Sequence, residues 1–234
     1  MARPAAHRAV MASREPGLDP DDFFPTGPWG GRAGGEIIKR LDPKARSAGE
    51  FACGAGHMVH ALRDYFPIVR ASDAYPYDGN VIHDFLGEAD PPWEVDWIVS
   101  NPPFADGKAE AFIRRAYPLA RRGVAMLLRV GMLESATRYP LHMEDCPLTV
   151  FAPFCERLPI TKGRWEPDGN SAAFYAWFFY LKPVLRPRRF MARIGETYHP
   201  ATYLIPPGTE ARLTRESDAR LFGAVDRSKV GGRR

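Results

Sequence analysis

Cysteine is scarce in this sequence of 234 residues, which contains 3 of them. Cys53, Cys146 and Cys155 form no C-x-x-C pair, so the sequence indicates neither a disulfide framework nor a zinc knuckle. An odd number of unpaired thiols instead fits a reducing compartment.

Long apolar runs are also missing. No stretch approaches the roughly 20 residues needed to cross a bilayer, and residues 1–17 lack the apolar core of a secretory signal. We therefore expect a cytoplasmic protein with no membrane partner. His57, His60 and His83 lack metal-ligand spacing with one another, so no metal site is expected.

Apolar residues make up 45% of the chain and aromatic residues 12%, which is enough for one substantial core. The net charge of +4 is uneven, because residues 182–234 hold 12 Lys and Arg against 5 Asp and Glu, a net +7 that leaves −3 for residues 1–181. This basic segment is consistent with contact to a nucleic-acid backbone or with a solvated tail. We expect a loose arm over residues 1–20, one main domain over 21–183 and a basic extension over 184–234.

Helix and strand periodicities alternate through the first 130 residues. The pattern predicts strands at 47–53, 68–73, 95–101 and 123–131, with helices at 30–41, 57–66 and 108–123. Two later apolar runs, 148–160 and 171–183, predict final strands, the second of them buried on both faces. This order indicates an α/β fold in which a mostly parallel sheet has helices on both faces and an antiparallel hairpin at its C-terminal edge.

A glycine turn stands between the first predicted strand and its helix. Gly54 and Gly56 lack a Cβ, so a ligand can lie directly on the backbone there. Asp73 ends the next strand, where a carboxylate can accept both hydroxyls of a ribose. Asp84 follows at a position suited to an adenine amino group, with Phe85 beside it for stacking. Taken singly, each acid is also consistent with an exposed turn or a helix N-cap.

Phosphate-binding patterns are absent from this turn. The sequence is G-A-G-H, not G-x-G-x-x-G, and no P-loop lysine follows. A ligand with a nucleoside but no phosphate fits better, which points to S-adenosylmethionine. Glu50 would then lie near the ammonium group of that ligand, while a surface charge at the strand end is an equal alternative.

The tetrapeptide NPPF, residues 101–104, follows the strand predicted at 95–101. Neither proline has an N–H to donate, so the strand must end there. The exocyclic amino nitrogen of a base is a weak nucleophile because its lone pair is delocalised into the ring. The Asn101 side-chain oxygen and the Pro102 carbonyl can each accept one amino hydrogen, Pro103 helps to hold them rigidly, and Phe104 can stack on the base. A turn-forming Asn and a core aromatic are the simpler alternatives.

The motif EFACGAG, residues 50–56, followed by NPPF resembles class I S-adenosylmethionine-dependent methyltransferases, in the amino-methylating branch with [DNS]-P-P-[FYW]. Within it, FFPTGPW (23–29) and the segment 162–183 are similar to phage and prophage DNA adenine N6-methyltransferases. The resemblance implies a Rossmann-like fold with a seven-stranded sheet, a catalytic domain over 21–183, and S-adenosylhomocysteine as product. It also implies a set of cofactor-binding residues: Phe24, Pro25, Thr26, Trp29, Cys53, Gly54 and Gly56. An N-terminal staple packed on the sheet is the alternative for residues 24–29.

The expected substrate is adenine-containing DNA, with the target base flipped out of a duplex or offered on a single strand. Candidate contacts to it are Arg138, Lys162, Arg164 and Trp165. The simpler alternative for each is a solvated loop residue, with Trp165 covering the sheet edge. Three other functions stay open: methylation of RNA bases, methylation of a protein glutamine amide, and nucleic-acid binding without catalysis. Glutamine-specific relatives usually show NPPY, so Phe104 favours a nucleobase.

Overall fold

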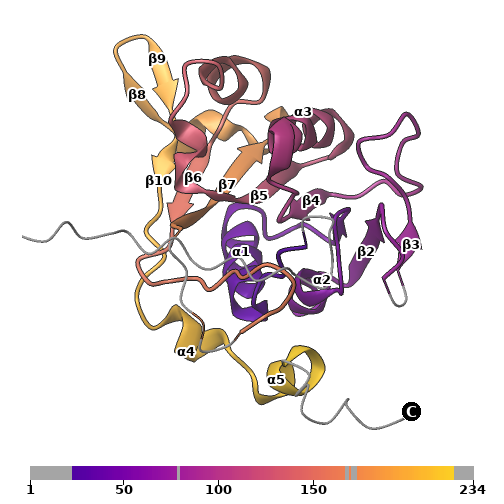
Figure 1. Ribbon diagram of the computed structural model, residues 1–234. Coiled ribbons are helices and arrows are strands. Elements are labelled where there is room, and N and C mark those ends of the chain that lie inside the picture. The colour runs from indigo at the N-terminus through magenta and orange to yellow at the C-terminus, as the bar shows by residue number, and fades with distance from the viewer. Residues whose placement is uncertain (1–22, 78–79, 167–168, 170–172, 224–234) are drawn as a thin grey trace, which may run out of the picture.

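The computed structural model describes residues 23–77, 80–166, 169 and 173–223. Its main sheet has eight strands in the order β10-β6-β7-β5-β4-β1-β2-β3 (Figure 1). All of them run in one direction except β7, which is antiparallel to both of its neighbours. The strands are β1 (Ser47–Glu50), β2 (Ile68–Asp73), β3 (Val81–Ile82), β4 (Trp97–Ser100), β5 (Gly123–Arg129), β6 (Val150–Pro153), β7 (Tyr175–Leu181) and β10 (Ala201–Thr202).

The predicted α/β architecture is confirmed, with a difference at one edge of the sheet. The sheet has eight strands instead of seven, because β10 pairs in parallel with β6. The antiparallel pair β6–β7 therefore lies inside the sheet and not at its edge. Strand β10 is only two residues long and comes from the basic extension, so it carries too little periodicity to be predicted from sequence.

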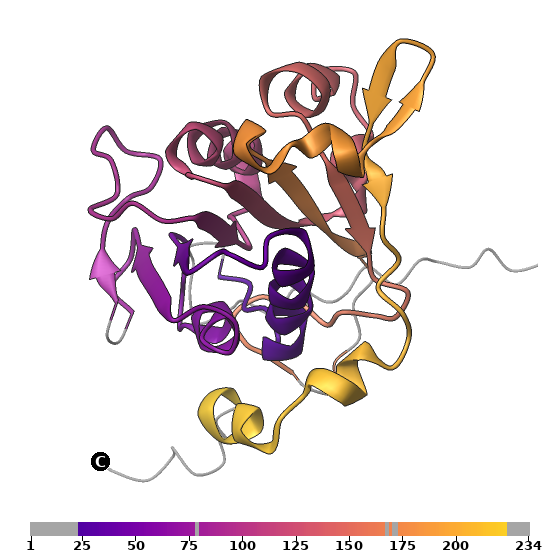
Figure 2. The ribbon, with the colours of Figure 1, turned by 180° about the vertical axis from the view of Figure 1, so that it is seen from behind.

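Helices cover both faces of the sheet, as expected. Helices α1 (Pro28–Leu41) and α2 (His57–Leu62) lie on one face and α3 (Lys108–Leu119) on the other (Figures 1 and 2). Helix α1 can approach the sheet closely because Gly34 has no Cβ. A Cβ there would lie 2.5 Å from the Trp177 ring. Shorter turns are η1 (Ala105–Gly107), η2 (Val130–Leu133), the π-helical turn η3 (Leu141–Asp145), η4 (Pro183–Leu185) and η5 (Pro187–Phe190).

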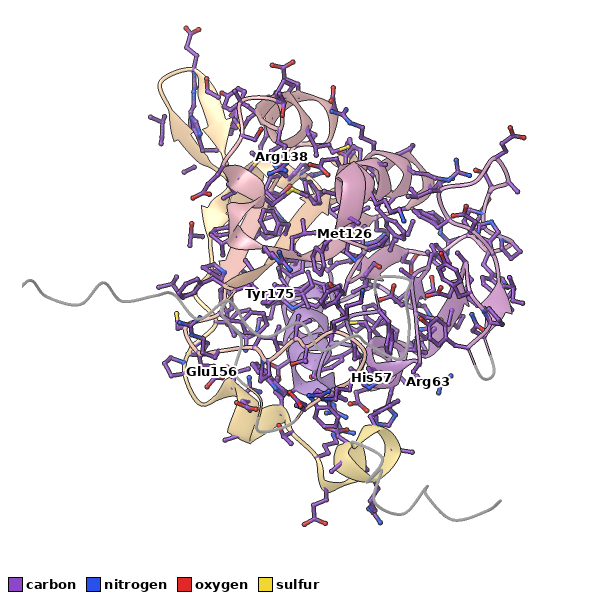
Figure 3. The ribbon with its side chains drawn as sticks, viewed as in Figure 1. His57, Arg63, Met126, Arg138, Glu156 and Tyr175 are labelled. Carbon is purple, nitrogen blue, oxygen red and sulfur yellow. The ribbon has the colours of Figure 1, made fainter. Side chains whose placement is uncertain are left out.

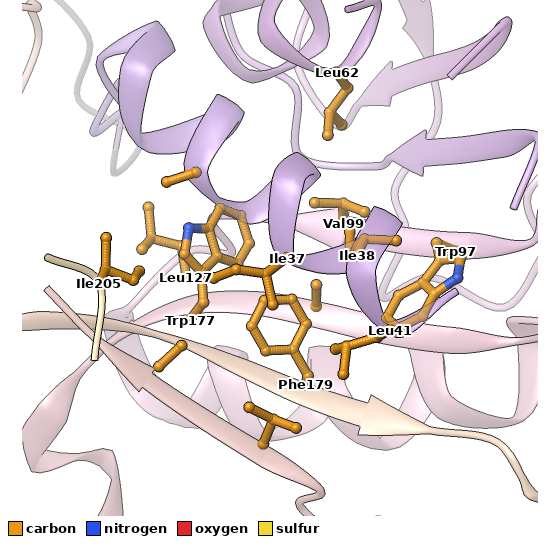
Figure 4. Close-up of a cluster of buried hydrophobic side chains, with 14 of the residues drawn as sticks. Ile37, Ile38, Leu41, Leu62, Trp97, Val99, Leu127, Trp177, Phe179 and Ile205 are labelled. Carbon is orange, nitrogen blue, oxygen red and sulfur yellow. The ribbon is translucent and has the colours of Figure 1, made fainter. Parts of the chain in front are cut away.

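The strand alternation separates two apolar cores. Trp97 and Val99 of β4 face α1, whereas Ile98 between them faces α3. Figure 4 shows the first cluster, in which Trp177 and Phe179 of β7 pack under α1. Phe178, which lies between them in the strand, belongs to the second cluster. Strand β7 is therefore buried on both faces, as predicted.

The described part of the C-terminal extension folds back onto the main domain. Strands β8 (Ala192–Ile194) and β9 (Thr197–His199) form a separate hairpin, and α4 (Thr209–Leu213) and α5 (Glu216–Phe222) continue past α1 (Figure 2). The fully buried Arg32 of α1 donates to both carboxylate oxygens of Asp218, at 2.6 and 2.8 Å, and to the Leu213 carbonyl at 2.9 Å. Strand β10 and helices α4 and α5 of the extension thus pack against the main domain, while the predicted arm at 1–20 lies outside the described residues. Across the described residues, no helix combines the length and apolarity that a membrane crossing requires.

Candidate active site

A cavity of about 230 Å³ opens at the carboxyl ends of β1, β2 and β4. In open parallel sheets, ligands bind beyond this edge because the loops there leave a crevice. Most of the predicted cofactor and catalytic residues line it: Phe24, Pro25, Thr26, Glu50, Cys53, Gly54, Asp73, Asp84, Phe85, Asn101, Pro102 and Pro103.

Gly54 of the glycine turn lines the cavity, whereas Gly56 does not. Gly54 and Gly56 have φ of +49° and +85°, in the left-handed region that favours glycine. Asp73 anchors this turn, since its Oδ2 accepts from the Gly54 N–H at 2.8 Å and its Oδ1 accepts from the Tyr75 N–H at 3.0 Å. The carboxylate therefore reaches the cavity from the end of β2, and it also fixes the backbone on which a ligand would lie.

Asp84 and Phe85 are only partly placed as predicted. Asp84 is exposed at the cavity rim, and its Oδ1 accepts from the Leu86 N–H at 2.9 Å. The ring of Phe85 is 2% exposed, with Phe51 stacked on it at 5.2 Å and Phe112 tilted against it at 4.4 Å. Phe85 thus lines the cavity as a buried core residue and does not present an open stacking face, because neighbouring rings already cover it.

Glu50 is buried at the end of β1. Its Oε1 accepts from the Ser100 hydroxyl at 2.6 Å and from the Ala52 N–H at 3.0 Å. Burial raises the pKa of Glu50 to about 8, and the negative charge of Asp73 acts in the same direction. A buried carboxyl group with this pKa is suited to a cationic group, which would restore the charged form.

Asn101 lines the cavity directly after β4. Its Nδ2 donates to the Phe24 carbonyl at 2.8 Å, which fixes the orientation of the amide. Its Oδ1 is buried and has no hydrogen-bond partner among the described residues. Since a buried acceptor without a partner is costly, this oxygen is the strongest indication of an absent ligand in the site.

The residues after Asn101 divide between the cavity wall and the surface beside it. Pro102 and Pro103 line the cavity. The Phe104 ring packs edge-on against Phe24 at 5.9 Å and lies outside the wall. It is half-buried, with Arg129 over the ring at 5.2 Å.

The residues of the N-terminal segment 23–29 divide between the cavity and the apolar core. Phe24, Pro25 and Thr26 reach the cavity, and the buried Thr26 Oγ1 has no partner among the described residues. Trp29 was expected to line the pocket, but it packs in the core, edge-on to Phe154 at 5.4 Å. The reason is helical geometry, since Trp29 is already inside α1 and turns toward the sheet.

Cys53 also reaches the cavity, where its thiol contacts the Gly54 carbonyl at 3.5 Å. Burial raises the pKa of Cys53 to about 12, and the nearby acids Glu50 and Asp73 raise it further. A thiol with this pKa stays protonated at neutral pH, so Cys53 is a wall of the site and not a nucleophile.

The four predicted substrate contacts do not come together. Arg138 pairs with Glu110 at 2.5 Å, and Figure 3 shows it well away from His57. Arg164 pairs with Glu166 at 2.6 Å, next to the half-buried Lys162.

Trp165 is buried against Gly27, and its Nε1 has no partner among the described residues. It lies edge-on to His57 at 6.3 Å, so it belongs to the cavity surroundings and not to an exposed base-reading surface.

Sequence reasoning missed several residues of the site, among them Phe23, His57 and Ser100. Phe23 blocks the space over Gly54, since a Cβ there would lie 2.7 Å from its ring. His57 lines the cavity with a pKa lowered to about 4 by burial, under the Phe222 ring at 4.2 Å. Ser100 precedes Asn101 in the motif, and this adjacency is the one signal that could have identified it. Within the described residues, no group of three or more His, Cys, Asp or Glu side chains could hold a metal ion.

Comparison with known proteins agrees with this geometry at the level of fold. No family model and no curated protein matches the chain. The type I restriction-modification methyltransferase subunit from Streptococcus thermophilus is similar in structure, with a TM-score of 0.56, 12% identity, and coverage of 83% of this chain and 53% of that chain. A protein described as a modification subunit of a type I restriction enzyme from Vibrio vulnificus has a TM-score of 0.50 and 12% identity over 87% of this chain and 52% of its own.

The chain thus spans about half the length of these two subunits. At 12% identity the likeness concerns the arrangement of the strands and helices, and not individual side chains. With the sheet order and the cavity at its carboxyl edge, it shows that this chain has the Rossmann-like fold of the methyltransferases.

Proposed function

We propose that this protein transfers a methyl group from S-adenosylmethionine to the N6 amino group of an adenine in DNA. One observation carries the proposal: the buried Asn101 Oδ1 has no partner among the described residues, while the Nδ2 of the same amide is held by the Phe24 carbonyl. A fixed acceptor is therefore already in place on a residue that lines the cavity, which is the preorganisation that polar catalysis requires.

The cavity residues fit the proposed cofactor. Glu50 offers a buried carboxylate to its ammonium group, and Asp73, which lines the cavity and holds the Gly54 turn, offers an acid for the ribose. The partnerless Thr26 hydroxyl lies in the same cavity and can bond to a polar group at the methionine end. When bound, S-adenosylmethionine supplies an electrophilic methyl group on a sulfonium.

The protein's part in the reaction is to orient the amino group. Asn101 Oδ1 and the Pro102 carbonyl each accept one amino hydrogen, which directs the nitrogen lone pair toward the methyl group. The nitrogen gains the methyl, the sulfonium becomes the thioether of S-adenosylhomocysteine, and the methylated nitrogen sheds one proton to solvent. A single acceptor of this kind contributes about a hundredfold to a thousandfold in rate.

A nucleic-acid base is favoured over a glutamine amide by two features. The Phe104 ring beside the tip suits a planar base. The type I modification subunits that share the fold also suggest a nucleic-acid substrate. RNA bases and a protein glutamine amide carry similarly delocalised nitrogens. They are the alternative substrates with which DNA is compared in the test.

The test is transfer of a tritiated methyl group to DNA, RNA and protein substrates in parallel. We expect label in adenine-containing DNA, and a loss of about a hundredfold or more in Asn101→Ala. Asn101→Asp keeps an acceptor oxygen but cannot donate to the Phe24 carbonyl, so it should retain part of the activity. Calorimetry should show unchanged cofactor binding in both variants.

Three outcomes would contradict the proposal. Label in RNA or protein alone would make the substrate wrong. Wild-type rates in Asn101→Ala would remove the proposed role of its oxygen. A wild-type protein that fails to bind S-adenosylmethionine would instead favour a nucleic-acid-binding module without catalysis.

A further inference from the structure

A row of arginine and aromatic side chains continues along the sheet edge beyond Asn101, the residue that follows β4 and is called the tip below. We propose that Arg129, Phe174 and Arg157 bind the nucleic-acid strand that carries the target base. This inference rests on the proposed function and names the partner of the same site. None of the three residues was singled out by the sequence, because each is unremarkable until the sheet places it at this edge.

Arg129 is the last residue of β5 and is exposed. It lies opposite Tyr175 in the β5–β7 ladder. Its guanidinium carbon is 5.2 Å from the centre of the Phe104 ring. No carboxylate of the described residues forms an ion pair with Arg129, so its charge is available to a phosphate next to the target base.

Phe174 and Arg157 form a second pair further along the edge. Phe174 precedes β7, is 62% exposed, and its carbonyl accepts from the Val130 N–H at 2.9 Å. The exposed Arg157, which follows β6, lies over the Phe174 ring at 4.3 Å. An exposed aromatic ring with a guanidinium on it provides a stacking surface for an unpaired base and a cation for its phosphate.

The sheet order places these groups in a line. Reading outward from the tip, Asn101 follows β4, Arg129 ends β5, Phe174 precedes β7 and Arg157 follows β6, and these four strands are consecutive neighbours. Because β7 is antiparallel, its first residues lie at the carboxyl edge of the others. At about 4.8 Å per strand, the row from β4 to β6 spans about 14 Å.

The row and the cofactor half of the cavity lie on opposite sides of the tip. The glycine turn and Asp73 follow β1 and β2, which are on the other side of β4 in the sheet. A base held at Asn101 would therefore have the cofactor on one side and its own strand on the other. Two arginines and an exposed ring match a polyanion with π faces better than a peptide that presents a glutamine.

The experiment measures binding of a fluorescein-labelled, adenine-containing single-stranded DNA by anisotropy over a series of KCl concentrations. We expect Arg129→Ala and Arg157→Ala each to make the slope of log K against log[KCl] shallower by about 0.7. Phe174→Ala should weaken binding about tenfold with little change in slope, and Phe174→Trp should restore it.

Arg193→Ala provides the matched control. Arg193 is an exposed arginine on the β8–β9 hairpin, which follows the end of β7 at the opposite edge of the sheet. It should keep the wild-type slope. All variants should bind S-adenosylhomocysteine with wild-type affinity in calorimetry, since none of these residues lines the cavity.

The outcomes separate this inference from the proposed function. If the wild type methylates DNA while Arg129→Ala and Arg157→Ala keep the wild-type slope, the proposed function stands and the inference fails. If Arg193→Ala lowers the slope as much as they do, the inference also fails, since binding would then be spread over the surface. A labelled glutamine peptide that binds in an Arg129-dependent way, with no binding of DNA, would overturn both.

Discussion

The Ser100 hydroxyl donates to Glu50 Oε1 at 2.6 Å, and both side chains are buried. This bond links the end of β1 to the end of β4, so the residue next to Asn101 also holds the acid proposed to bind the cofactor. Ser100 and Asn101 are adjacent in the chain. The proposed cofactor half and the proposed substrate half of the site are therefore joined through one strand end.

Cofactor binding should depend on the protonation of Glu50. The pKa of the buried carboxyl is raised to about 8, so at pH 7 it is mainly neutral before binding, and a cationic ammonium group favours its charged form. Binding should therefore release a proton from Glu50, and the part of the affinity that depends on ionisation of Glu50 should rise as pH increases toward about 8 and level off above it. Calorimetry with S-adenosylmethionine in buffers of different ionisation enthalpy measures this release.

Glu50→Gln isolates that effect from the titration of the ligand itself. The variant should bind more weakly and lose the part of the proton release that belongs to Glu50. The exposed Glu88→Gln provides a control of the same chemistry and should behave as the wild type. Equal proton release in Glu50→Gln and the wild type would show that Glu50 does not face the ammonium group.

The two glycines of the turn should respond differently to alanine. Gly54 has φ +49° and a Cβ there would lie 2.7 Å from the Phe23 ring, whereas Gly56 has φ +85° and open space around it. Gly56→Ala should cost about 1–2 kcal/mol of stability from backbone strain alone. Gly54→Ala should add displacement of Phe23 and weaken S-adenosylhomocysteine binding further. Denaturant unfolding and calorimetry measure the two effects, and the opposite ranking for binding would contradict the structure.

The buried ion pair between Arg32 and Asp218 should hold the C-terminal helices in place. Both side chains are essentially inaccessible, so Asp218→Ala leaves a buried guanidinium with less compensation and should cost about 3–5 kcal/mol of unfolding free energy. Arg215→Ala removes a half-exposed partner of Asp64 and should cost about 1 kcal/mol or less. Chemical denaturation followed by circular dichroism compares them. Equal and small losses would mean that residues 208–223 do not dock as described.

The Phe222 ring should control the pKa of His57. Burial lowers the pKa of His57 to about 4, and Phe222 stacks on it at 4.2 Å. Phe222→Ala should let water reach the imidazole, so its pKa should rise toward 6.5, the ordinary histidine value. An NMR titration of the ring protons measures this shift. The exposed Leu221→Ala, on the same helix, should leave the pKa near 4, and an unchanged value in Phe222→Ala would exclude the stacking contact.

Local patterns were sufficient to determine most of the fold from the sequence. Strand β2 occupies the predicted residues 68–73, and β4, β5, β6 and β7 fall within the predicted runs. The glycine turn and the proline pair also follow from local rules, since φ above zero favours Gly and a missing N–H ends a strand. These features depend on residues close together in the chain, which is why the sequence alone determined them.

Only the tertiary structure decided which side chains share a site. Trp29 turned into the core, Phe85 was covered by two rings, and Arg138 lay apart from His57. The Arg32–Asp218 pair joins residues 186 positions apart. Burial, pairing and the orientation of a side chain depend on which distant segments pack against it, and that packing is a property of the whole fold and not of local periodicity.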